Sequence, residues 1–389
     1  MKRFISTIAG AAFLLGSTSL TFALEEGKLL IWIGVNRDEA ALGEIAKRFT
    51  DDLGVPVTIE VVDPDLAQKF QQAAATGDGP DIVLWVHDRF GEWAQGGLIS
   101  AVEPSPKMTA GILESAWDAV TFGGKTWGYP VFVESIGLVY NKDLVPTPPA
   151  TFEEIAALSV PEGKTRIMWD YNNAYFTMPL LMANGGYAFQ KKDGVYDGKD
   201  TGVNNEGAIK GGEMLKKLID DGTMPKGVDG GITDATMAKG DVAMIINGPW
   251  SWANYEQAGI NFGVAPLPSI DGQPAKPFIG VGAFAINAAS PNQDLAEELI
   301  TNYILTDEGV AAWNGKGMLG ATANIAAGAT TSDNVKATLA NAAVGVPMPS
   351  NPEMGAFWAA VPAALSNITS GAQEVKPALD DAAKRILGE

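Results

Sequence analysis

The chain has 389 residues, of which 46% are hydrophobic and 19% are charged, and its net charge is −19. This length and composition predict a folded globular protein of two domains, and the acidic excess argues against binding nucleic acid or an anionic membrane surface. The chain has no cysteine and one histidine, His87. This excludes thiol catalysis and disulfides and removes the usual ligands of a zinc site, so we expect no cofactor and no metal.

The N-terminal segment has the layout of a secretory signal peptide. It begins with the basic stretch MKR, continues with an apolar run and ends with small residues around Phe22. The apolar core, residues 8–15, is too short to cross a bilayer. We therefore expect residues 1–23 to be removed near Ala23 and the mature protein to be exported to the periplasm.

Strand and helix patterns alternate in the following segment. Aliphatic runs at 28–33, 55–62 and 81–85 predict short strands. Apolar residues at helical spacing in 38–54 and 65–77 predict two helices, each of which ends at a glycine. This β-α-β-α-β order predicts a parallel sheet with helices on its faces.

Polar and aromatic residues follow the first and third of these strands. Asn36 and Arg37 come after the first strand, and Trp85, Asp88 and Arg89 come at the end of the third. In open α/β sheets, ligands bind beyond the carboxyl ends of the strands. These two groups are therefore expected to converge on one rim of the sheet.

The middle of the chain predicts a second lobe. Residues 124–146 form a long extended run that contains Glu134. A carboxylate is unusual in a buried strand, and it fits a crossing between two lobes. Residues 240–252 repeat the pattern of a buried strand ending in aromatic residues, Trp250 and Trp252. At most one of these two is expected to face a cleft.

The chain then crosses back. Residues 276–292 predict another crossing strand, with glycines that allow close backbone approach. We expect a first lobe of residues 24–133 plus 282–328 and a second lobe of residues 134–281 plus 329–389. Each lobe is expected to be a mostly parallel sheet flanked by helices, and a multi-strand hinge with a cleft should join them.

The mature chain carries eight notable segments in a fixed order: EEGKLLIWI, AATGDGPDIVLWVHDRF, YNKDL, YFTMPL, INGPWSW, GQPAKPFIGVGAFAINAASPN, LTDEG and AFWAAV. In order and spacing they resemble the periplasmic maltose/maltodextrin-binding proteins. The resemblance implies the two-lobe periplasmic binding protein fold, a sugar ligand between the lobes and an inner-membrane ABC transporter permease as partner. Members of that family also signal to chemoreceptors, which makes a chemoreceptor a candidate partner. We expect a monomer.

The resemblance also implies ligand-binding residues. Arg37 stands where the family has a Lys that bonds sugar hydroxyls, Glu134 matches a carboxylate of the crossing strand, and Met348 matches an apolar contact. The other matches are polar and aromatic pocket residues: Trp85, Asp88, Arg89, Tyr175, Trp250 and Trp358. Asn36, which stands where the family has an Asp, is kept among the predicted contacts.

The chain departs from the family pattern at several pocket positions. The residues that stand in place of the family's side chains are Asn36, Asp65, Ala67, Asn173, Ala359 and Pro362. Several polar contacts to the sugar are therefore changed, which leaves the preferred sugar length and linkage open.

The residue types themselves suit a sugar. Pyranose rings have apolar C–H faces that pack on Trp and Tyr rings. Sugar hydroxyls pair with planar charged groups, so Asp88 and Glu134 are expected to accept hydrogen bonds while Arg37 and Arg89 donate them. These charges are expected to balance one another, because unpaired buried ions are costly. The prediction is a non-catalytic receptor for maltose or maltodextrins.

Other interpretations remain open from the residues alone. Trp85 packs in the core and Asp88 lies on the surface in the simplest case, and His87 is expected to be structural. A receptor of the same fold for trehalose, a peptide or an anion is one alternative, although the aromatic residues argue against an anion. A glycoside hydrolase that uses Asp88 and Glu134 is another, although nothing in the sequence predicts a raised pKa for either carboxyl group.

Overall fold

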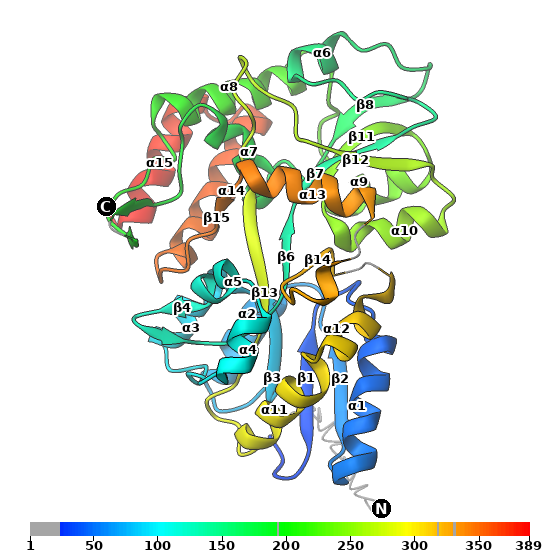
Figure 1. The fold of residues 1–389 in the computed structure, drawn as a ribbon. Coiled ribbons are helices and arrows are strands. Elements are labelled where there is room, and N and C mark those ends of the chain that lie inside the picture. Colours follow the sequence, from blue (N-terminus) through cyan, green and yellow to red (C-terminus); the bar gives the residue numbers. More distant parts are fainter. Residues whose placement is uncertain (1–23, 193, 317–318, 330–331) are drawn as a thin grey trace, which may run out of the picture.

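The computed structural model describes residues 24–192, 194–316, 319–329 and 332–389. The predicted signal peptide and its cleavage near Ala23 lie outside the described residues. Figure 1 shows two bodies, one above the other, with the long strands β6 and β13 running between them. Mixed helix and strand content in two bodies confirms the predicted α/β fold of two lobes.

The first body is built on a seven-stranded sheet of order β14-β6-β13-β3-β1-β2, in which β15 also pairs with β13. The first third of the chain supplies most of this body. Its elements are β1 (Leu29–Ile33), α1 (Glu39–Leu53), β2 (Val57–Val61), α2 (Leu66–Ala74), β3 (Ile82–Val86), the 3-10 turn η1 (His87–Arg89), α3 (Phe90–Gln95), α4 (Pro106–Gly111), α5 (Glu114–Ala119), β4 (Thr121–Phe122), β5 (Lys125–Thr126) and β6 (Tyr129–Ser135).

The second body is built on a four-stranded sheet of order β12-β7-β11-β8. Helices cover this sheet in Figure 1. Its elements before the chain crosses back are β7 (Gly137–Asn141), α6 (Phe152–Ala157), β8 (Thr165–Met168), α7 (Ala174–Ala183), β9 (Gln190–Lys192), β10 (Val195–Asp197), α8 (Glu206–Asp220), α9 (Gly230–Ala238), β11 (Val242–Asn247), the 3-10 turn η2 (Pro249–Ser251), α10 (Trp252–Gln257) and β12 (Phe262–Ala265).

The last third of the chain returns to the first body and then closes the second. The returning elements are β13 (Phe278–Ile286), α11 (Gln293–Leu299), the π-helical stretch η3 (Ile300–Ile304), α12 (Asp307–Trp313), the 3-10 turn η4 (Asn314–Lys316), β14 (Ala321–Thr322) and the 3-10 turn η5 (Ala327–Ala329). The closing elements are α13 (Asp333–Val344), β15 (Val346–Pro347), α14 (Met354–Ser370) and α15 (Val375–Leu387).

Strand direction confirms one prediction and corrects another. β1 pairs in parallel with both β2 and β3, as the β-α-β-α-β order predicted. However, β13 runs antiparallel to β3 and to β6, and β7 runs antiparallel to β11 and β12. The sheets are therefore mixed and not mostly parallel. The reason is that β13 arrives directly from the second body, whereas a parallel strand needs a crossover connection within its own body.

Buried apolar side chains form two separate clusters. One cluster draws on residues 29–132 and 281–323. The other draws on residues 136–278 and 335–386, together with Ala321. Each body therefore has an apolar core of its own, and the lobe boundaries expected from the sequence stay a prediction.

Local sequence signals explain most helix ends. The Asp38 side chain accepts a hydrogen bond from the Ala41 backbone N–H at the start of α1, and Gly54, with φ 72°, ends that helix as predicted. By contrast, α2 ends at Ala74, three residues before the predicted glycine stop. The backbone N–H of Gly77 bonds to the carbonyl of Ala74 instead, in a turn that follows the helix.

Among the described residues, the helices are all too short or too polar to cross a membrane.

Candidate functional site

A cavity of about 380 Å³ is lined by residues of both bodies. This volume lies at the small end of the range of about 300–1,000 Å³ that small-molecule pockets occupy. The lining residues are Gly34, Val35, Arg37, Leu84, Trp85, Val86, Asp88, Arg89, Phe132, Glu134, Asn173, Tyr175, Phe176, Trp250, Met348 and Trp358.

Strand ends of the first body place the charged side chains in this cavity. Arg37 lies in the turn between β1 and α1, and Asp88 lies in η1, directly after β3. Because β1 and β3 are parallel neighbours, their carboxyl ends meet at one edge of the sheet. Arg37 from the first group therefore lines the same cavity as Trp85, Asp88 and Arg89 from the second group.

Arg37 and Glu134 form a buried ion pair. Arg37 Nη2 lies 2.9 Å from Glu134 Oε2. The guanidinium also lies over the ring of Phe132, with Cζ 4.2 Å from the ring centroid. Phe132 and Glu134 are two residues apart on β6, so the strand period puts both on the same face. This face of the crossing strand holds Arg37 in place by charge and by a cation–π contact.

Asp88 is a buried carboxyl group with one donor from the second body. Trp358 Nε1 donates a hydrogen bond to Asp88 Oδ2 at 2.8 Å. Burial raises the pKa of Asp88 to about 7, while the charge of Arg89 and the bond from Trp358 oppose this rise. Nothing in the sequence indicated this raised pKa, because the depth of burial is a property of the folded chain.

Arg89 makes its closest ion pair with Glu92, which does not line the cavity. Its Nη1 lies 3.0 Å from Glu92 Oε2, one turn further along the chain, while its Nε is 3.9 Å from Asp88 Oδ2. Glu92 Oε1 in turn accepts a hydrogen bond from Gln71 Nε2 at 2.8 Å. Arg89 is therefore oriented by α3 and α2 as well as by Asp88.

Aromatic rings from the second body form the opposite wall. The centroids of Tyr175 and Trp250 are 6.1 Å apart, and Phe176 lies 5.6 Å from Tyr175 and 6.3 Å from Trp250. Tyr175 and Phe176 come from the first turn of α7, and Trp250 comes from η2 after β11. Three rings at this spacing make an apolar wall that suits the face of another ring.

Two buried polar atoms of the lining have no hydrogen-bond partner within the described part of the chain. They are Arg37 Nη1 and Tyr175 Oη. Burial raises the pKa of Tyr175 well above its usual value, so its hydroxyl keeps its proton and can donate. Buried polar groups are nearly always hydrogen-bonded. The cavity therefore offers two donors to a ligand that carries acceptor oxygens.

The two arginines and two carboxyl groups that line the cavity balance one another in charge when both carboxyl groups are ionised. Arg37 and Arg89 are positive, and Asp88 and Glu134 are negative when ionised. A balanced set gives no net attraction for an anion or a cation. The arrangement favours an uncharged ligand with several hydroxyl groups and apolar ring faces.

The structure brings together nearly all predicted contacts. Arg37, Trp85, Asp88, Arg89, Glu134, Tyr175, Trp250, Met348 and Trp358 all line this cavity. Asn36 does not, although its neighbour does. Asn36 adopts a left-handed conformation with φ 58° in the turn between β1 and α1.

Sequence reasoning missed two aromatic lining residues. Phe132 could have been found, because it lies two residues before Glu134 on a strand. Phe176 carried no such signal, because adjacent residues on a helix point about 100° apart and Tyr175 was already assigned to the pocket. Both rings face this cavity because it extends along β6 and around the end of α7.

Positions that depart from the family pattern divide into two groups. Asn173 lines the cavity and also caps α7, where its Oδ1 accepts from the Tyr175 backbone N–H at 3.1 Å. The others do not line it. These are Asn36 in the turn after β1, Asp65 and Ala67 at the start of α2, and Ala359 and Pro362 on α14.

The interpretation of the aromatic neighbours holds. Trp252 is buried in the core of the second body whereas Trp250 lines the cavity. Similarly, Phe357 is fully buried and Trp358 lines the cavity. His87 is buried between backbone groups, as expected for a structural residue.

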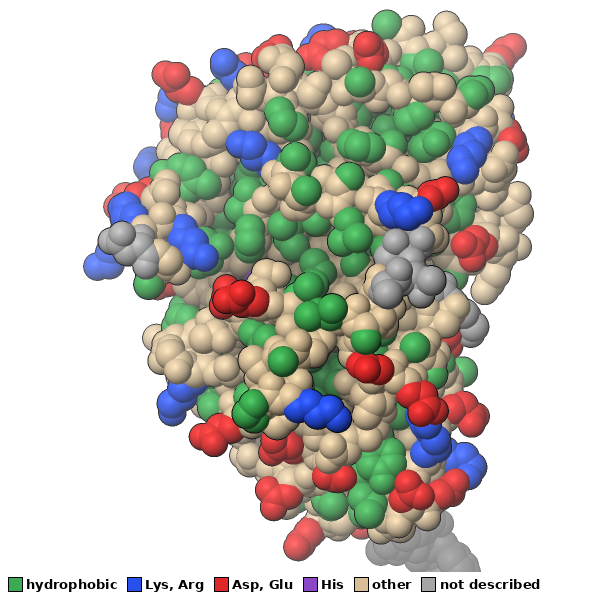
Figure 2. All heavy atoms as spheres, viewed as in Figure 1, with side chains coloured by type: hydrophobic (Ala, Val, Ile, Leu, Met, Phe, Trp, Pro, Cys, Tyr) green, Lys and Arg blue, Asp and Glu red, His purple; other side chains and the backbone are tan. Residues whose placement is uncertain are grey.

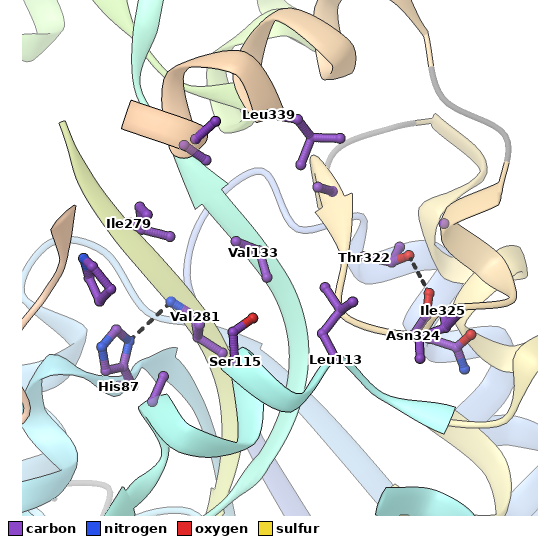
Figure 3. Close-up of a pocket in the computed structure, with 16 residues that line it drawn as sticks. His87, Leu113, Ser115, Val133, Ile279, Val281, Thr322, Asn324, Ile325 and Leu339 are labelled. Carbon is purple, nitrogen blue, oxygen red and sulfur yellow. Dashed lines mark hydrogen bonds between the residues drawn. The ribbon is translucent and has the colours of Figure 1, made fainter. Parts of the chain in front are cut away.

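A second cavity of about 530 Å³ opens on another side of the crossing strands (Figure 3). Its lining is largely apolar, with Leu113, Ile325 and Leu339 partly exposed, and His87 is the one ionisable residue among the described residues that line it. Figure 2 shows hydrophobic side chains at the surface at this level, between the two bodies. No charged groups converge on this groove in the described part of the chain, so it is not the candidate site.

Within the described residues, no group of three or more His, Asp or Glu side chains is arranged to hold a metal ion.

Comparison with known proteins identifies relatives along most of the chain. The Maltodextrin-binding protein MdxE of Bacillus subtilis is 28% identical over 417 residues, covering 99% of this chain and 97% of that protein. A Galactooligosaccharide-binding protein of the same organism is 28% identical, covering 86% and 83%. A Maltooligosaccharide ABC transporter solute-binding lipoprotein of Streptococcus pneumoniae is also 28% identical, covering 88% and 84%.

A family of proteins matches the chain across both bodies. The match to the family described as Bacterial extracellular solute-binding protein covers residues 44–342. This range includes Asp88 and Arg89 after β3, the crossing strands and two of the aromatic lining segments, whereas Arg37 precedes it and Trp358 follows it. With its fold of two bodies and its lined cavity, the chain belongs to the bacterial extracellular solute-binding protein family.

Proposed function

We propose that this chain captures maltose or maltodextrins in the cavity between its two bodies and delivers them unaltered to an inner-membrane ABC importer. One observation carries this proposal. The cavity joins a wall of aromatic rings to two arginines and two carboxyl groups, and the buried atoms Arg37 Nη1 and Tyr175 Oη have no partner among the described residues. A neutral sugar supplies both ring faces and hydroxyl oxygens.

The relatives support a saccharide over other ligands. The three compared here are named for maltodextrin, galactooligosaccharide and maltooligosaccharide, and one is named as part of an ABC transporter. They share 28% identity with this chain, and their named sugars differ. A maltose-type ligand follows from the resemblance of the pocket residues, with trehalose as the alternative within the same fold.

The family is extracellular, which supports export. We further infer a periplasmic location, with the signal peptide cleaved near Ala23, and a monomeric state. A chemoreceptor partner stays a prediction from the resemblance.

A panel titration tests the ligand class. Trp85, Trp250 and Trp358 line the cavity, so intrinsic fluorescence should report binding. We expect a saturable response to maltose or maltotriose, compared with trehalose, sucrose and glucose. Trp250→Ala should weaken the response at least about tenfold, because large aromatic side chains dominate such contacts.

Trp127→Phe is the matched control. Trp127 packs in the first body and its Nε1 donates to the carbonyl of Phe122, away from the cavity. This variant should keep the affinity of the natural protein. A panel in which no sugar changes the fluorescence or the melting temperature would contradict the proposal.

A glycoside hydrolase remains the second candidate because of one observation. The pKa of Asp88 is raised to about 7 by burial, and a carboxyl group with a raised pKa can act as a general acid. Glu134, however, is held in an ion pair with Arg37. The two candidates separate in an assay for new reducing ends after incubation with maltodextrin. We expect no release beyond a heat-treated control.

A further inference from the structure

The single histidine joins three segments of the chain where the two bodies meet. His87 is 1% exposed. Its Nδ1 accepts a hydrogen bond from the Val281 backbone N–H at 3.0 Å, as Figure 3 shows, and its Nε2 lies 2.8 Å from the carbonyl oxygen of Met348. Because Nδ1 is an acceptor, the neutral ring carries its proton on Nε2 and donates it to Met348.

The imidazole fills a gap in the large sheet. On one edge of β13, β15 pairs at Phe278 and Ile279, whereas β3 pairs from Gly282 onward. β6 pairs along the other edge of β13 from Ile279 to Phe284. Val281 lies between the two partners, and its N–H bonds to His87 in place of a strand. The ring therefore supplies the hydrogen-bond partner that β13 lacks in the gap between β3 and β15.

We propose that His87 is a positioning residue of the saccharide site, where it holds the strap at a fixed distance from Asp88. The strap is residues 348–353, which join β15 to α14. This inference rests on the proposed function, since it concerns the same cavity. It assigns to His87 a role in affinity that differs from its contribution to stability.

The strap and the turn that carries His87 both contribute to the cavity. Asp88 follows His87 directly, and Met348 is the strap residue whose carbonyl accepts from the ring. Trp358, on the helix that the strap leads into, donates to Asp88. A shift of the strap would therefore move Met348 and Trp358 relative to Asp88 in the same step.

A second contact shows how closely the strap packs on the first body. A Cβ atom added to Gly91 would lie 1.7 Å from the carbonyl oxygen of Ser350. Only a glycine allows this approach. The strap is thus fixed at two points, by a hydrogen bond at Met348 and by backbone packing at Ser350.

The hydrogen bonds of the ring depend on its being neutral. Both partners of the ring are backbone groups, and burial lowers the pKa of His87 to about 4. The ring is therefore uncharged at pH 7, where Nδ1 is free to accept from Val281.

Two amide variants separate the two hydrogen bonds. The side-chain oxygen of Asn can reach the place of Nδ1, so His87→Asn keeps the bond from Val281 and loses the bond to Met348. The side-chain nitrogen of Gln can reach the place of Nε2, so His87→Gln keeps the bond to the strap. His87→Phe keeps the ring volume and loses both bonds.

The readouts are the dissociation constant for maltotriose, from tryptophan fluorescence, and the melting temperature without sugar. We expect His87→Gln to bind within about threefold of the natural protein, and His87→Asn and His87→Phe to bind about tenfold more weakly, the effect of one hydrogen bond. His87→Asn and His87→Gln should melt at similar temperatures. The affinity for maltotriose would then depend on the hydrogen bond to Met348, whereas the melting temperature would not.

Equal affinities of the Asn and Gln variants would overturn the proposal, as would natural affinity in His87→Phe. If His87→Phe does not fold, the Asn and Gln pair still decides. A natural protein that binds no saccharide at all would instead refute the proposed function, and this inference with it.

The ¹⁵N spectrum of the lone imidazole gives a second test at pH 7. It should show the Nε2–H form, and a charged ring or the Nδ1–H form would contradict the geometry.

Discussion

At the scale of single residues, burial acts on two sequence neighbours in opposite directions. His87 is a base, so burial lowers its pKa to about 4, and Asp88 is an acid, so burial raises its pKa to about 7. The lowered pKa of His87 contributes to the free energy of unfolding above the usual pKa of 6.5, and this contribution is lost as the pH falls through 4. The raised pKa of Asp88 contributes to the free energy of unfolding below the usual pKa of 3.8, and this contribution is lost as the pH rises through 7.

The natural protein should therefore lose stability as the pH rises, and Asp88→Asn should not. Asn stays neutral and its Oδ1 can still accept from Trp358. The unfolding free energy of this variant relative to the natural protein should increase between pH 4 and pH 7.5 by on the order of 2 kcal/mol. Urea unfolding without sugar at the two pH values measures this difference. A difference that does not change with pH would show that Asp88 is ionised throughout that range.

Single residues also decide how the site is built. Arg37 was predicted from its place after the first strand, and the ion pair with Glu134 explains why a carboxylate stands in an apolar crossing strand. The sequence could not predict which atoms remain without partners. That follows only when Arg37 Nη1 and Tyr175 Oη are enclosed by residues that are far away in the chain.

At the scale of helices and strands, glycines distinguish packed faces from open ones. A Cβ atom at Gly211 on α8 would lie 2.2 Å from the carbonyl oxygen of Leu180 on α7, because these helices pack closely. A Cβ atom at Gly43 on α1 would meet nothing within 4 Å. The same residue type, in two helices of equal length, therefore serves different purposes.

This contrast gives a matched pair of variants. Gly211→Ala should lower the free energy of unfolding by about 1–3 kcal/mol, because the helices must separate. Gly43→Ala should raise it by about 0.5–1 kcal/mol, because alanine restricts the unfolded chain and favours the helix. Urea unfolding of both variants checks the prediction. Equal effects would mean that α7 can move away from α8 at little cost.

At the scale of the whole molecule, the crossing strand β6 separates two cavities. Phe132 and Glu134 line the candidate site, while Val133 lines the groove in Figure 3. Successive residues of a strand point to opposite faces. The candidate site and the groove therefore lie on opposite sides of the crossing strands, so a rotation that widens one should narrow the other.

Leu339→Trp should exploit this arrangement. Leu339 lies on α13 and lines the groove while 42% exposed. Added bulk there opposes narrowing of the groove, so it should favour the conformation described here and strengthen maltotriose binding about three- to tenfold. Ala340→Trp, exposed on the same helix but outside the groove lining, is the control. Fluorescence titration compares the two, and equal affinities would exclude this coupling.

The sequence alone determined the periodic features of this protein. Strand and helix order up to Trp85, the glycine at the end of α1 and the crossing strand with Glu134 follow from local patterns, because burial on one face of an element repeats at its own period. The rim containing Arg37, Trp85 and Asp88 followed from the rule for strand ends. Features with such local signals were predictable.

Tertiary structure alone decided how distant segments meet. Three contacts join residues at least 194 positions apart. They are the antiparallel pairing of β13 with β3, the hydrogen bond from Trp358 to Asp88, and the hydrogen bonds of His87 with Val281 and Met348. No local pattern records such contacts, because they arise when two bodies fold against shared crossing strands. The raised pKa of Asp88 has the same origin, since desolvation depends on everything that surrounds a group in the folded molecule.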